Sequence, residues 1–424
     1  MKKILLIALC TFFCLELGAQ DLESSTEADF ITLYGKVMDQ GAGDPLHYAS
    51  VNLSGTSITN VSNAEGIFSL KIPSGTPADA FLLVSHLGYR TISLPISNFE
   101  GSSIRHPVLV SLPPVSLMLD PAIVHAVDPE AIFAAAFYRI KDNYPQAHVG
   151  MTAFYREMIR RGSGKYLALN EAVVDIDKAS YGGIQADRSG IYKGRGSLNY
   201  DRSDSLIINF QGGITTALEI DMVKNPFVGA TFDESLKVYD FTLEPSVIID
   251  GKSFYVVKFD QKPHVEEILF NGKVYIESES LAIGRLEFSM NSEGREEEAS
   301  HAFVIKRPPQ TTFYVTGTQY IVNYREDGGL WYFDYCRMDL GLATRRKGTL
   351  FRNYYTVTGE MAVTNRSSKP ISIDPAHRVK FRDILSQKVT DFTDDNFWED
   401  YNIIEPDQSI ESAIKKIVRQ LEKR

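Results

Sequence analysis

The chain has 424 residues and a formal net charge of −10 at pH 7, with 44% hydrophobic and 11% aromatic residues. This length predicts two or three domains, with enough apolar sequence for a large core. The net negative charge argues against nucleic acids and anionic lipid headgroups as general partners.

The N-terminus has the pattern of a cleavable secretory signal. Two lysines precede an apolar run, and Leu17-Gly18-Ala19 supplies the small residues that signal peptidase prefers. The run is too short for a transmembrane helix, so we expect residues 1–19 to be removed on export. The residues before Cys10 and Cys14 fit a lipobox poorly, and cleavage without lipidation is therefore the expected outcome.

Cleavage would leave Cys336 as the single cysteine, so the mature chain could form no internal disulfide. Its stability would then come from the hydrophobic core. Cys336 lies in an apolar strand pattern and is expected as a small core residue. No later segment approaches the roughly 20 apolar residues of a membrane span.

Residues 30–112 have the pattern of a small β-sandwich. Strands are predicted at Leu33–Met38, Ala49–Leu53 and Phe68–Ile72, where apolar and polar residues alternate or turn residues intervene. Phe81–Ser85 is continuously apolar, which predicts a strand buried on both faces.

Four motifs in this segment resemble, in order and spacing, the carboxypeptidase regulatory-like domain. They are Gly35-Lys36-Val37, Pro45-Leu46-His47-Tyr48-Ala49-Ser50-Val51, Asn63-Ala64-Glu65-Gly66-Ile67-Phe68-Ser69-Leu70 and Ser85-His86-Leu87-Gly88-Tyr89. The resemblance implies a transthyretin-like Greek-key sandwich of seven strands. It also implies an exported protein of the Bacteroidetes type, associated with the outer membrane, and no active site in this domain.

A linker with a helix is expected at residues 113–145. Prolines end the sandwich, and Asp128-Pro129-Glu130 then has the sequence of a capped helix start. Apolar residues at helical spacing follow, up to Asn143-Tyr144-Pro145.

Residues 146–404 are predicted to form a large curved antiparallel sheet. The dipeptides Asp250-Gly251 and Asn271-Gly272 each separate two apolar runs and predict type I′ hairpins. Residues 326–329 predict the turn of a longer hairpin. The complete fold expected is therefore mainly β.

A C-terminal amphipathic helix is expected within residues 405–424. Its apolar stripe has helical spacing and consists of Ile410, Ala413, Ile414, Ile417, Val418 and Leu421. We expect the stripe to pack on the sheet, while a helix that docks on a partner remains the alternative.

The β region also resembles, over about 45 residues, the sheets of periplasmic lipoprotein carriers. The similar segments are Gly251–Val257, Gly272–Glu277 and Leu281–Ile283. The resemblance implies a curved sheet that covers a lipid-accepting cavity.

One pair of residues has the spacing of a zinc ligand motif. His264 and Glu267 form the His-x-x-Glu pattern that begins a zinc carboxypeptidase site, and His377 is a distant candidate for a third ligand. Such a pair is expected by chance in a chain with 8 histidines and 54 acidic residues. Since it also lies in a predicted hairpin meander, no metal, catalytic or cofactor-binding residue is assigned, and no cofactor is expected.

Two further groups of polar residues could bind ligands. Arg156 and Glu157 could orient a ligand carboxylate, but a solvated ion pair is the expected role. Glu171, Asp175 and Asp177 share one face of a strand and could hold Ca²⁺. They lack a loop with regular ligand spacing, so a solvent-exposed face is expected.

These observations favour a non-catalytic exported protein of the periplasm, or of the periplasmic side of the outer membrane. It would bind an envelope protein partner or an apolar ligand through its C-terminal β region. The alternative is a metal-dependent hydrolase or peptidase with the sandwich as an accessory domain. The two differ in whether His264 and Glu267 bind a metal.

Overall fold

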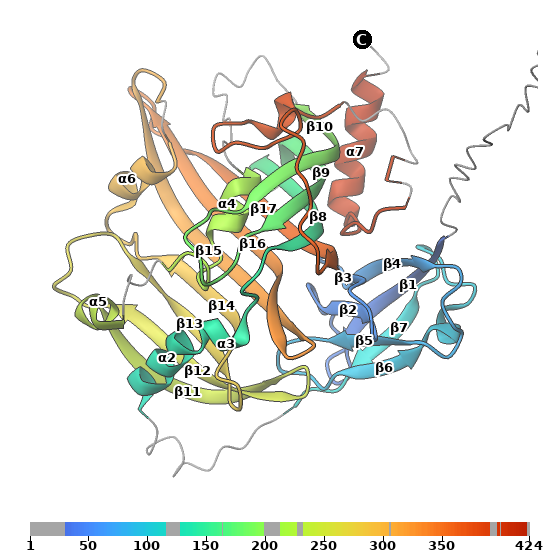
Figure 1. The fold of residues 1–424 in the computed structure, drawn as a ribbon. Coiled ribbons are helices and arrows are strands. Elements are labelled where there is room, and N and C mark those ends of the chain that lie inside the picture. Colours follow the sequence, from blue (N-terminus) through green and yellow to red (C-terminus); the bar gives the residue numbers. More distant parts are fainter. Residues whose placement is uncertain are drawn as a thin grey trace, which may run out of the picture.

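The computed structural model describes most of the chain in three sheets and several helices (Figure 1). The described residues are 30–115, 128–162, 164–198, 213–226, 232–304, 307–390, 397–398 and 400–421. The predicted signal at residues 1–19 lies outside them. The predicted mainly β fold, with a sandwich, a large antiparallel sheet and a C-terminal helix, is confirmed.

The N-terminal sandwich has seven strands in two sheets. In one, β1 (Phe30–Asp39) lies between β4 (Ile67–Pro73), to which it is antiparallel, and β7 (Val108–Leu112), to which it is parallel. The other has the order β3 (Thr59–Val61), β2 (Ser50–Leu53), β5 (Phe81–Ser85) and β6 (Ile92–Pro95). Alternate apolar side chains of both sheets form the core between them.

Two glycines of the sandwich motifs allow its layers to approach closely. A Cβ at Gly35 would lie 2.3 Å from the Phe68 ring. Gly66 has φ +76°, and a Cβ there would lie 2.5 Å from the Val37 carbonyl oxygen. The prediction that β5 is buried on both faces is wrong, because Phe81 is 45% exposed and Leu83 only partly buried. Since β5 belongs to a sandwich of only two sheets, one face of the strand lies in the core and the other does not.

Ten strands form the large sheet, in which all neighbours are antiparallel. The spatial order is β10 (Arg188–Leu198), β9 (Lys165–Lys178), β8 (Val149–Arg161), β17 (Asn353–Ser367), β16 (Leu330–Arg346), β15 (Thr311–Asp327), β14 (Ile283–Met290), β13 (Phe270–Glu277), β12 (Lys252–Gln261) and β11 (Tyr239–Ile249). The last strand of the chain thus inserts beside the first strand of the sheet.

The predicted hairpins differ in outcome. Asp250 and Gly251 have φ of +52° and +75° and join β11 to β12, as predicted. Asn271 and Gly272 form no turn, so that prediction is wrong. Both lie inside β13, where a Cβ at Gly272 would come within 2.1 Å of the Glu287 carbonyl oxygen. This glycine serves close packing between neighbouring strands instead.

Helices cover one face of the large sheet. They are α2 (Pro129–Tyr138), α3 (Ile140–Asn143) and α4 (Gly213–Glu219), with α5 (Phe232–Val238) beside β11 and α6 (Glu296–Ala299) beside β15. The Asp128 carboxylate accepts a hydrogen bond of 3.0 Å from the Glu130 N–H, which confirms the predicted helix start. Cys336 is buried under α4, and its thiol donates to the Ala217 carbonyl oxygen at 3.4 Å. It is the core residue that the sequence predicts.

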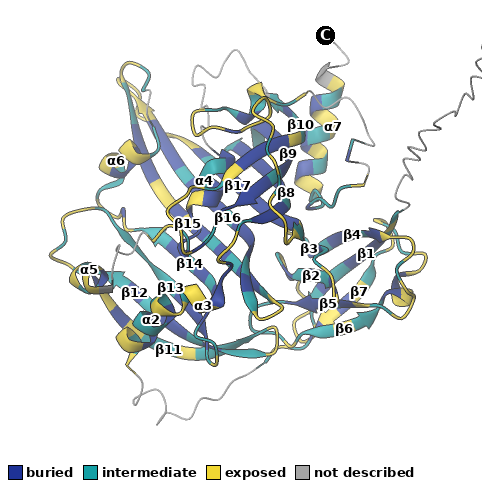
Figure 2. Ribbon diagram, in the orientation of Figure 1, coloured by how far each residue is buried: buried dark blue, intermediate teal, exposed yellow. Residues whose placement is uncertain are grey.

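The sandwich and α7 (Gln408–Leu421) pack against the opposite face of the sheet, so the long strands lie between two covering layers (Figure 2). Ile410 and Ile417 of α7 contact Met158 and Leu169. The predicted packing of this helix on the sheet is confirmed. No helix in the described ranges combines the length and apolar character needed to cross a membrane.

A buried lysine joins the sheet to the segment after α4. The Lys178 ammonium lies 2.6 Å from carboxylate oxygens of both Asp187 and Asp221. The hydroxyls of Tyr181 and Tyr324 also donate to Asp221, at 2.9 and 2.6 Å. Asp221 therefore links β9, the segment that follows it and β15 through one carboxylate.

We predict that Asp221→Ala lowers the free energy of unfolding by roughly 3–5 kcal/mol, because it leaves a buried charge and two hydroxyls short of their acceptor. Urea unfolding followed by tryptophan fluorescence would measure this change, since Trp331 belongs to β16 and Trp398 packs on the large sheet. Asp240→Ala, at an exposed carboxylate, is the matched control. A loss in Asp221→Ala no larger than in the control would contradict the assigned role.

Candidate binding site

The sandwich contacts the large sheet through an aromatic pair. Tyr48 follows the buried Leu46 and has φ +60°, an unfavourable conformation for a tyrosine. This conformation lets its ring stack on Tyr335 of β16, with ring centres 5.6 Å apart and planes inclined by 23°. The Arg337 guanidinium lies 5.0 Å from the centre of the same ring. Tyr48, in an unfavourable backbone conformation, therefore joins the sandwich to the large sheet.

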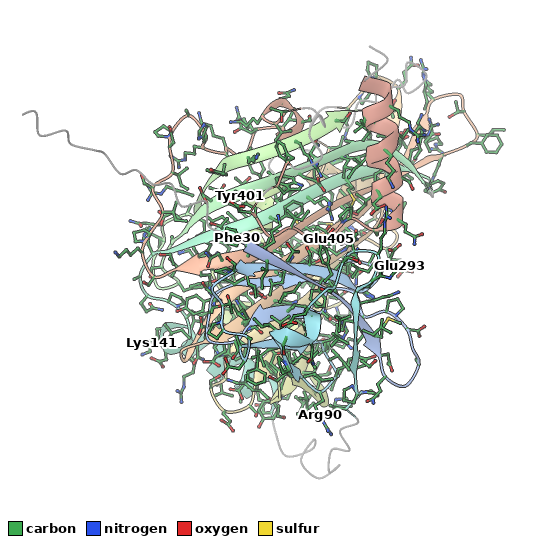
Figure 3. The ribbon with its side chains drawn as sticks, turned by 90° about the vertical axis from the view of Figure 1, so that its right-hand side faces the viewer. Phe30, Arg90, Lys141, Glu293, Tyr401 and Glu405 are labelled. Carbon is green, nitrogen blue, oxygen red and sulfur yellow. The ribbon has the colours of Figure 1, made fainter. Side chains whose placement is uncertain are left out.

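The segment between the sheet and α7 makes further bonds to the sandwich. The Asn60 side-chain amide donates to the Ile403 carbonyl oxygen at 2.7 Å. The Asn402 side chain accepts from the Lys71 N–H at 2.7 Å and donates to the Lys71 carbonyl oxygen at 3.1 Å. Glu405 lies at the same junction (Figure 3). Burial raises the pKa of its carboxyl, while a bond from Ser69 opposes that shift.

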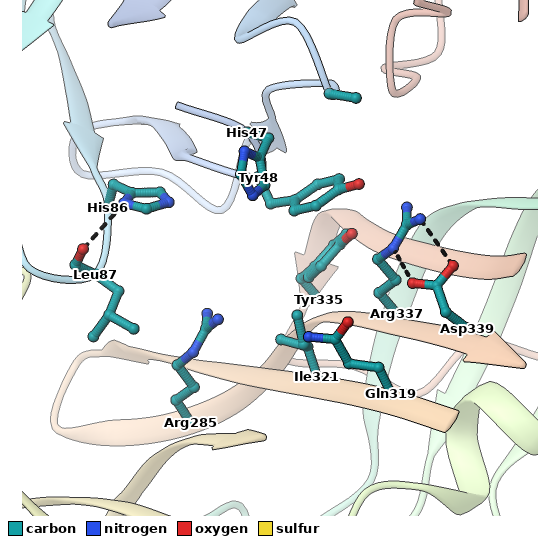
Figure 4. Close-up of a pocket in the computed structure, with 11 residues that line it drawn as sticks. His47, Tyr48, His86, Leu87, Arg285, Gln319, Ile321, Tyr335, Arg337 and Asp339 are labelled. Atoms are coloured by element: carbon teal, nitrogen blue, oxygen red, sulfur yellow. Dashed lines mark hydrogen bonds and ion pairs between the residues drawn. The ribbon is translucent and has the colours of Figure 1, made fainter. Parts of the chain in front are cut away.

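A pocket of about 440 Å³ opens beside the aromatic pair (Figure 4). The sandwich contributes His47, Tyr48, Ala64, His86 and Leu87, and the sheet contributes Arg285, Gln319, Ile321, Tyr335, Arg337 and Asp339. The site thus exists only because the two parts are docked. Figure 4 shows the two imidazoles on one side of the pocket and Arg285 on the other.

Both arginines of the pocket are held by carboxylates. Arg285 binds Glu287 through Nε and Nη2, at 2.8 and 2.7 Å, and donates to the Asn323 side chain at 2.8 Å. These bonds use three of its five N–H donors. Arg337 makes two bonds to Asp339, at 2.6 and 2.9 Å. Their orientations are therefore fixed before any ligand binds.

The two histidines of the pocket are held in the neutral form. Burial, with the nearby Arg285, lowers the pKa of His86 to about 4. Burial, with Arg337 and Arg285, also lowers the pKa of His47. The arginines thus create a positive potential that disfavours imidazolium and favours an anionic ligand. His86 Nδ1 lies 3.1 Å from the Leu87 carbonyl oxygen, an arrangement in which Nδ1 is the donor.

The Tyr335 hydroxyl is buried and has no hydrogen-bond partner among the described residues. Burial raises its pKa well above the ordinary value, so it stays protonated and can donate. Buried hydroxyl groups are normally satisfied by protein, water or ligand. The lining therefore offers hydrogen-bond donors and a positive potential, but no serine or cysteine nucleophile. This chemistry suits binding of an acidic group.

Behind the pocket, a buried network connects Arg337 to Arg156. Arg156 is 1% exposed and lies 2.7 Å from Glu171, 3.2 Å from Glu360 and 2.7 Å from the Ile404 carbonyl oxygen. Glu360 also binds Arg337, at 3.2 Å. The predicted solvated ion pair of Arg156 and Glu157 is therefore wrong, because alternate residues of β8 point to opposite faces and both are buried.

Glu157 lies on the helix-covered face of the sheet. Its carboxylate accepts from the Asn170 side-chain amide at 2.9 Å and from the Tyr155 hydroxyl at 3.4 Å. Burial raises the pKa of this carboxyl to about 7, although these bonds oppose the shift. A carboxylate without a cation at such a depth favours the protonated form.

The acidic face of β9 is also buried, contrary to the predicted solvent exposure. Glu171 is bound by Arg156 and by Arg195, the latter at 2.9 Å. Asp177 is bound by His148 at 3.0 Å and Arg188 at 2.5 Å. Asp175 is partly buried and accepts from Thr152 at 3.3 Å. Cations from neighbouring elements, which strand periodicity cannot show, make this burial possible.

The two candidate zinc ligands, His264 and Glu267, are exposed in the loop between β12 and β13. His377 lies near the opposite edge of the sheet, where its carbonyl oxygen accepts from Ile191 of β10. The structure therefore does not bring these three residues together. Within the described ranges, no three His, Cys, Asp or Glu side chains form a group that could hold a metal.

No pattern in the sequence pointed to the pocket residues as a site. His47 and His86 stand in two of the four resemblance motifs, but thirty-eight intervening positions separate them in the chain. Arg285 and Arg337 stand at polar positions of strands in which apolar and polar residues alternate, and such positions usually face solvent. One sequence signal could have suggested that His47 and His86 lie close together. Each follows a strand or turn of the same sandwich.

We predict that Glu157 lowers the free energy of unfolding of the wild type as pH rises from about 4.5 to about 7. The variant Glu157→Gln lacks this contribution. In this range the unfolded chain has released the Glu157 proton and the folded chain retains it, so rising pH favours unfolding. The difference between the two pH profiles should reach roughly 3 kcal/mol. Urea unfolding at a series of pH values measures both, and parallel profiles would refute the assignment.

Comparison with known proteins identifies part of the chain. Residues 33–119 match the family model of the CarboxypepD_reg-like domain. No curated protein matches the sequence. Among solved structures, the chain is similar to a DUF1329 family protein from Desulfovibrio piger, with 12% identity, a TM-score of 0.25, and coverage of 56% of this chain and 94% of that one.

It is also similar to the Pseudomonas aeruginosa MucA/MucB complex, with 12% identity, a TM-score of 0.19, and coverage of 58% of this chain and 100% of that one. Both TM-scores are too low to indicate a shared fold. The family match and the seven-stranded sandwich agree in position. Residues 33–119 therefore belong to the carboxypeptidase regulatory-like domain family.

Proposed function

We propose that this chain is a non-catalytic exported protein of the cell envelope that binds an acidic group of a protein partner between its sandwich and its sheet. The observation that carries this proposal is the pocket in which Arg285 and two neutral histidines face one another. Export rests on the secretory pattern of residues 1–19. The domain division proposed is residues 30–112, 113–145, 146–404 and 405–424.

The pocket is preorganised for a carboxylate. Glu287 and Asn323 fix the Arg285 guanidinium, and Asp339 and Glu360 fix that of Arg337. A partner carboxylate could therefore bind without ordering either arginine first. The stacked ring of Tyr48 supplies an adjacent apolar surface. A C-terminal carboxylate or an acidic side chain would suit this combination.

The helix-covered face of the sheet is packed with side chains, and this favours a protein partner over an apolar ligand. Phe133 of α2 and Ile214 and Ala217 of α4 are buried against that face. They occupy space that a carrier of apolar ligands would keep open. The junction pocket, by contrast, is lined largely by polar and charged side chains.

Site-specific photo-crosslinking in cells tests this function. We expect a photoreactive residue at Gln319, which is exposed and lines the pocket, to capture a discrete protein partner. Capture should fall at least about tenfold when Arg285→Gln removes the cation. The same probe at exposed Glu100 is the control for non-specific capture. Equal yields at both positions, or capture unaffected by Arg285→Gln, would disprove the proposal.

We predict that partner binding strengthens as pH falls from about 7 toward about 5. In the free protein His86 stays neutral in this range, because burial and Arg285 lower its pKa to about 4, and burial likewise lowers the pKa of His47. A bound carboxylate raises both values, so the complex takes up protons and acid favours it, by up to about tenfold for each unit of pKa rise. Fluorescence anisotropy with the captured partner measures the affinity.

The control is the double variant His47→Gln/His86→Gln, which cannot take up these protons. Its affinity should change little over the same pH range. If the wild type and the double variant respond identically to pH, the two histidines do not face the bound acidic group.

A further inference from the structure

The turn between β16 and β17 exposes apolar side chains at the end of the sheet away from the sandwich. Leu350 is 92% exposed, Phe351 85% and Tyr354 54%. The backbone beneath them is ordered, because the Thr349 N–H donates to the Arg346 carbonyl oxygen at 3.1 Å and the Lys347 N–H to that of Gln310 at 2.8 Å. A fixed turn that projects adjacent leucine and phenylalanine side chains indicates an interaction surface.

Basic residues surround these apolar side chains. The end of β8 lies alongside, since the Gly162 N–H donates to the Tyr354 carbonyl oxygen at 2.9 Å and Arg161 to the Asn353 side chain at 2.8 Å. We call residues 160–162, 164–165 and 345–352 together the basic tip. Its basic residues are Arg160, Arg161, Lys165, Arg345, Arg346, Lys347 and Arg352.

The charge of the basic tip is opposite to that of the whole protein. The sequence has no acidic residue between Asp339 and Glu360, or between Glu157 and Glu171. The short helix α6 borders the tip beside β15 and carries acidic residues at Glu296–Glu298. Glu298 is bound by Arg295 at 2.6 Å. The net charge of −10 therefore does not describe this end of the molecule.

We propose that the basic tip docks on the surface of a lipid bilayer that contains anionic lipids. Leu350 and Phe351 would enter the boundary between headgroups and acyl chains, and the surrounding arginines and lysines would contact the lipid phosphates. An acidic protein surface could pair with the cations of the tip. It would not, by its charge, account for the two adjacent and almost fully exposed apolar side chains, Leu350 and Phe351. The combination of both features favours lipid.

Docking in this way would place the junction pocket away from the bilayer. Arg337 of the pocket and Arg346 of the tip are nine residues apart on β16. At the rise of an extended strand, this separation is about 30 Å. The sheet would then hold the pocket clear of the lipid and open to a partner. The tip proposal does not depend on the pocket being a binding site.

Vesicle co-sedimentation of the mature protein, with its N-terminus determined, tests the proposal. We expect it to bind vesicles of equal phosphatidylglycerol and phosphatidylethanolamine, and not vesicles of phosphatidylcholine alone. Leu350→Ser/Phe351→Ser should weaken binding at least about tenfold, because burial of the two side chains is lost. Arg345→Ser/Arg346→Ser/Lys347→Ser should reduce the dependence of binding on salt.

The matched control is Phe81→Ser/Leu109→Ser, which removes an exposed phenylalanine and leucine from the sandwich. It should bind vesicles as the wild type does, and unfolding in urea verifies that each variant is folded. Absence of wild-type binding to the anionic vesicles, or unchanged binding of Leu350→Ser/Phe351→Ser, would overturn the proposal. So would a dimer that forms through the tip in solution without any vesicle binding.

Discussion

The arrangement of the two parts depends on a buried guanidinium. Arg156 binds Glu171 and Glu360 from the strands on either side of β8, and its third contact is the Ile404 carbonyl oxygen. That contact fixes the segment to which Asn60 of the sandwich is bonded. A buried charge is tolerated only where acceptors surround it, so the network must form as a unit. The position of the sandwich follows from it.

The same network gives the pocket its electrostatic character. Glu360 links Arg156 to Arg337, and Arg337 in turn lies over the ring of Tyr48. Three arginines and three carboxylates alternate from Arg195 to Asp339, so the buried charges balance. The positive potential therefore arises not from an excess of buried cations but from which groups face the pocket. Arg285 and Arg337 lie near enough to the imidazoles to lower their pKa values, and of the three carboxylates in this chain of charges Asp339 alone lines the pocket.

The two proposed surfaces lie apart along the same long strands, with the pocket at the middle of β15 and β16 and the basic tip at the end of β16. The pocket combines fixed polar groups with an aromatic ring, whereas the basic tip combines exposed apolar side chains with cations of which four, Arg345, Arg346, Lys347 and Arg352, are exposed. These are different kinds of recognition: the first favours a single acidic group, the second an extended anionic surface. A rigid sheet between them would let one molecule hold a partner at a set distance from a bilayer.

The sequence by itself determined the elements that local physics controls. The capped start of α2, the Asp250-Gly251 turn and the amphipathic α7 follow from residue type and spacing, as does the sandwich with its closely packed Gly35 and Gly66. Only the tertiary structure decided where charged residues lie. Periodicity assigned Arg156 and Glu171 to solvent, because it reveals which residues share a face and not what covers that face. The pocket likewise depends on tertiary structure. The docking of the sandwich on the sheet brings His47 and Arg337 together, and no local sequence pattern encodes that docking.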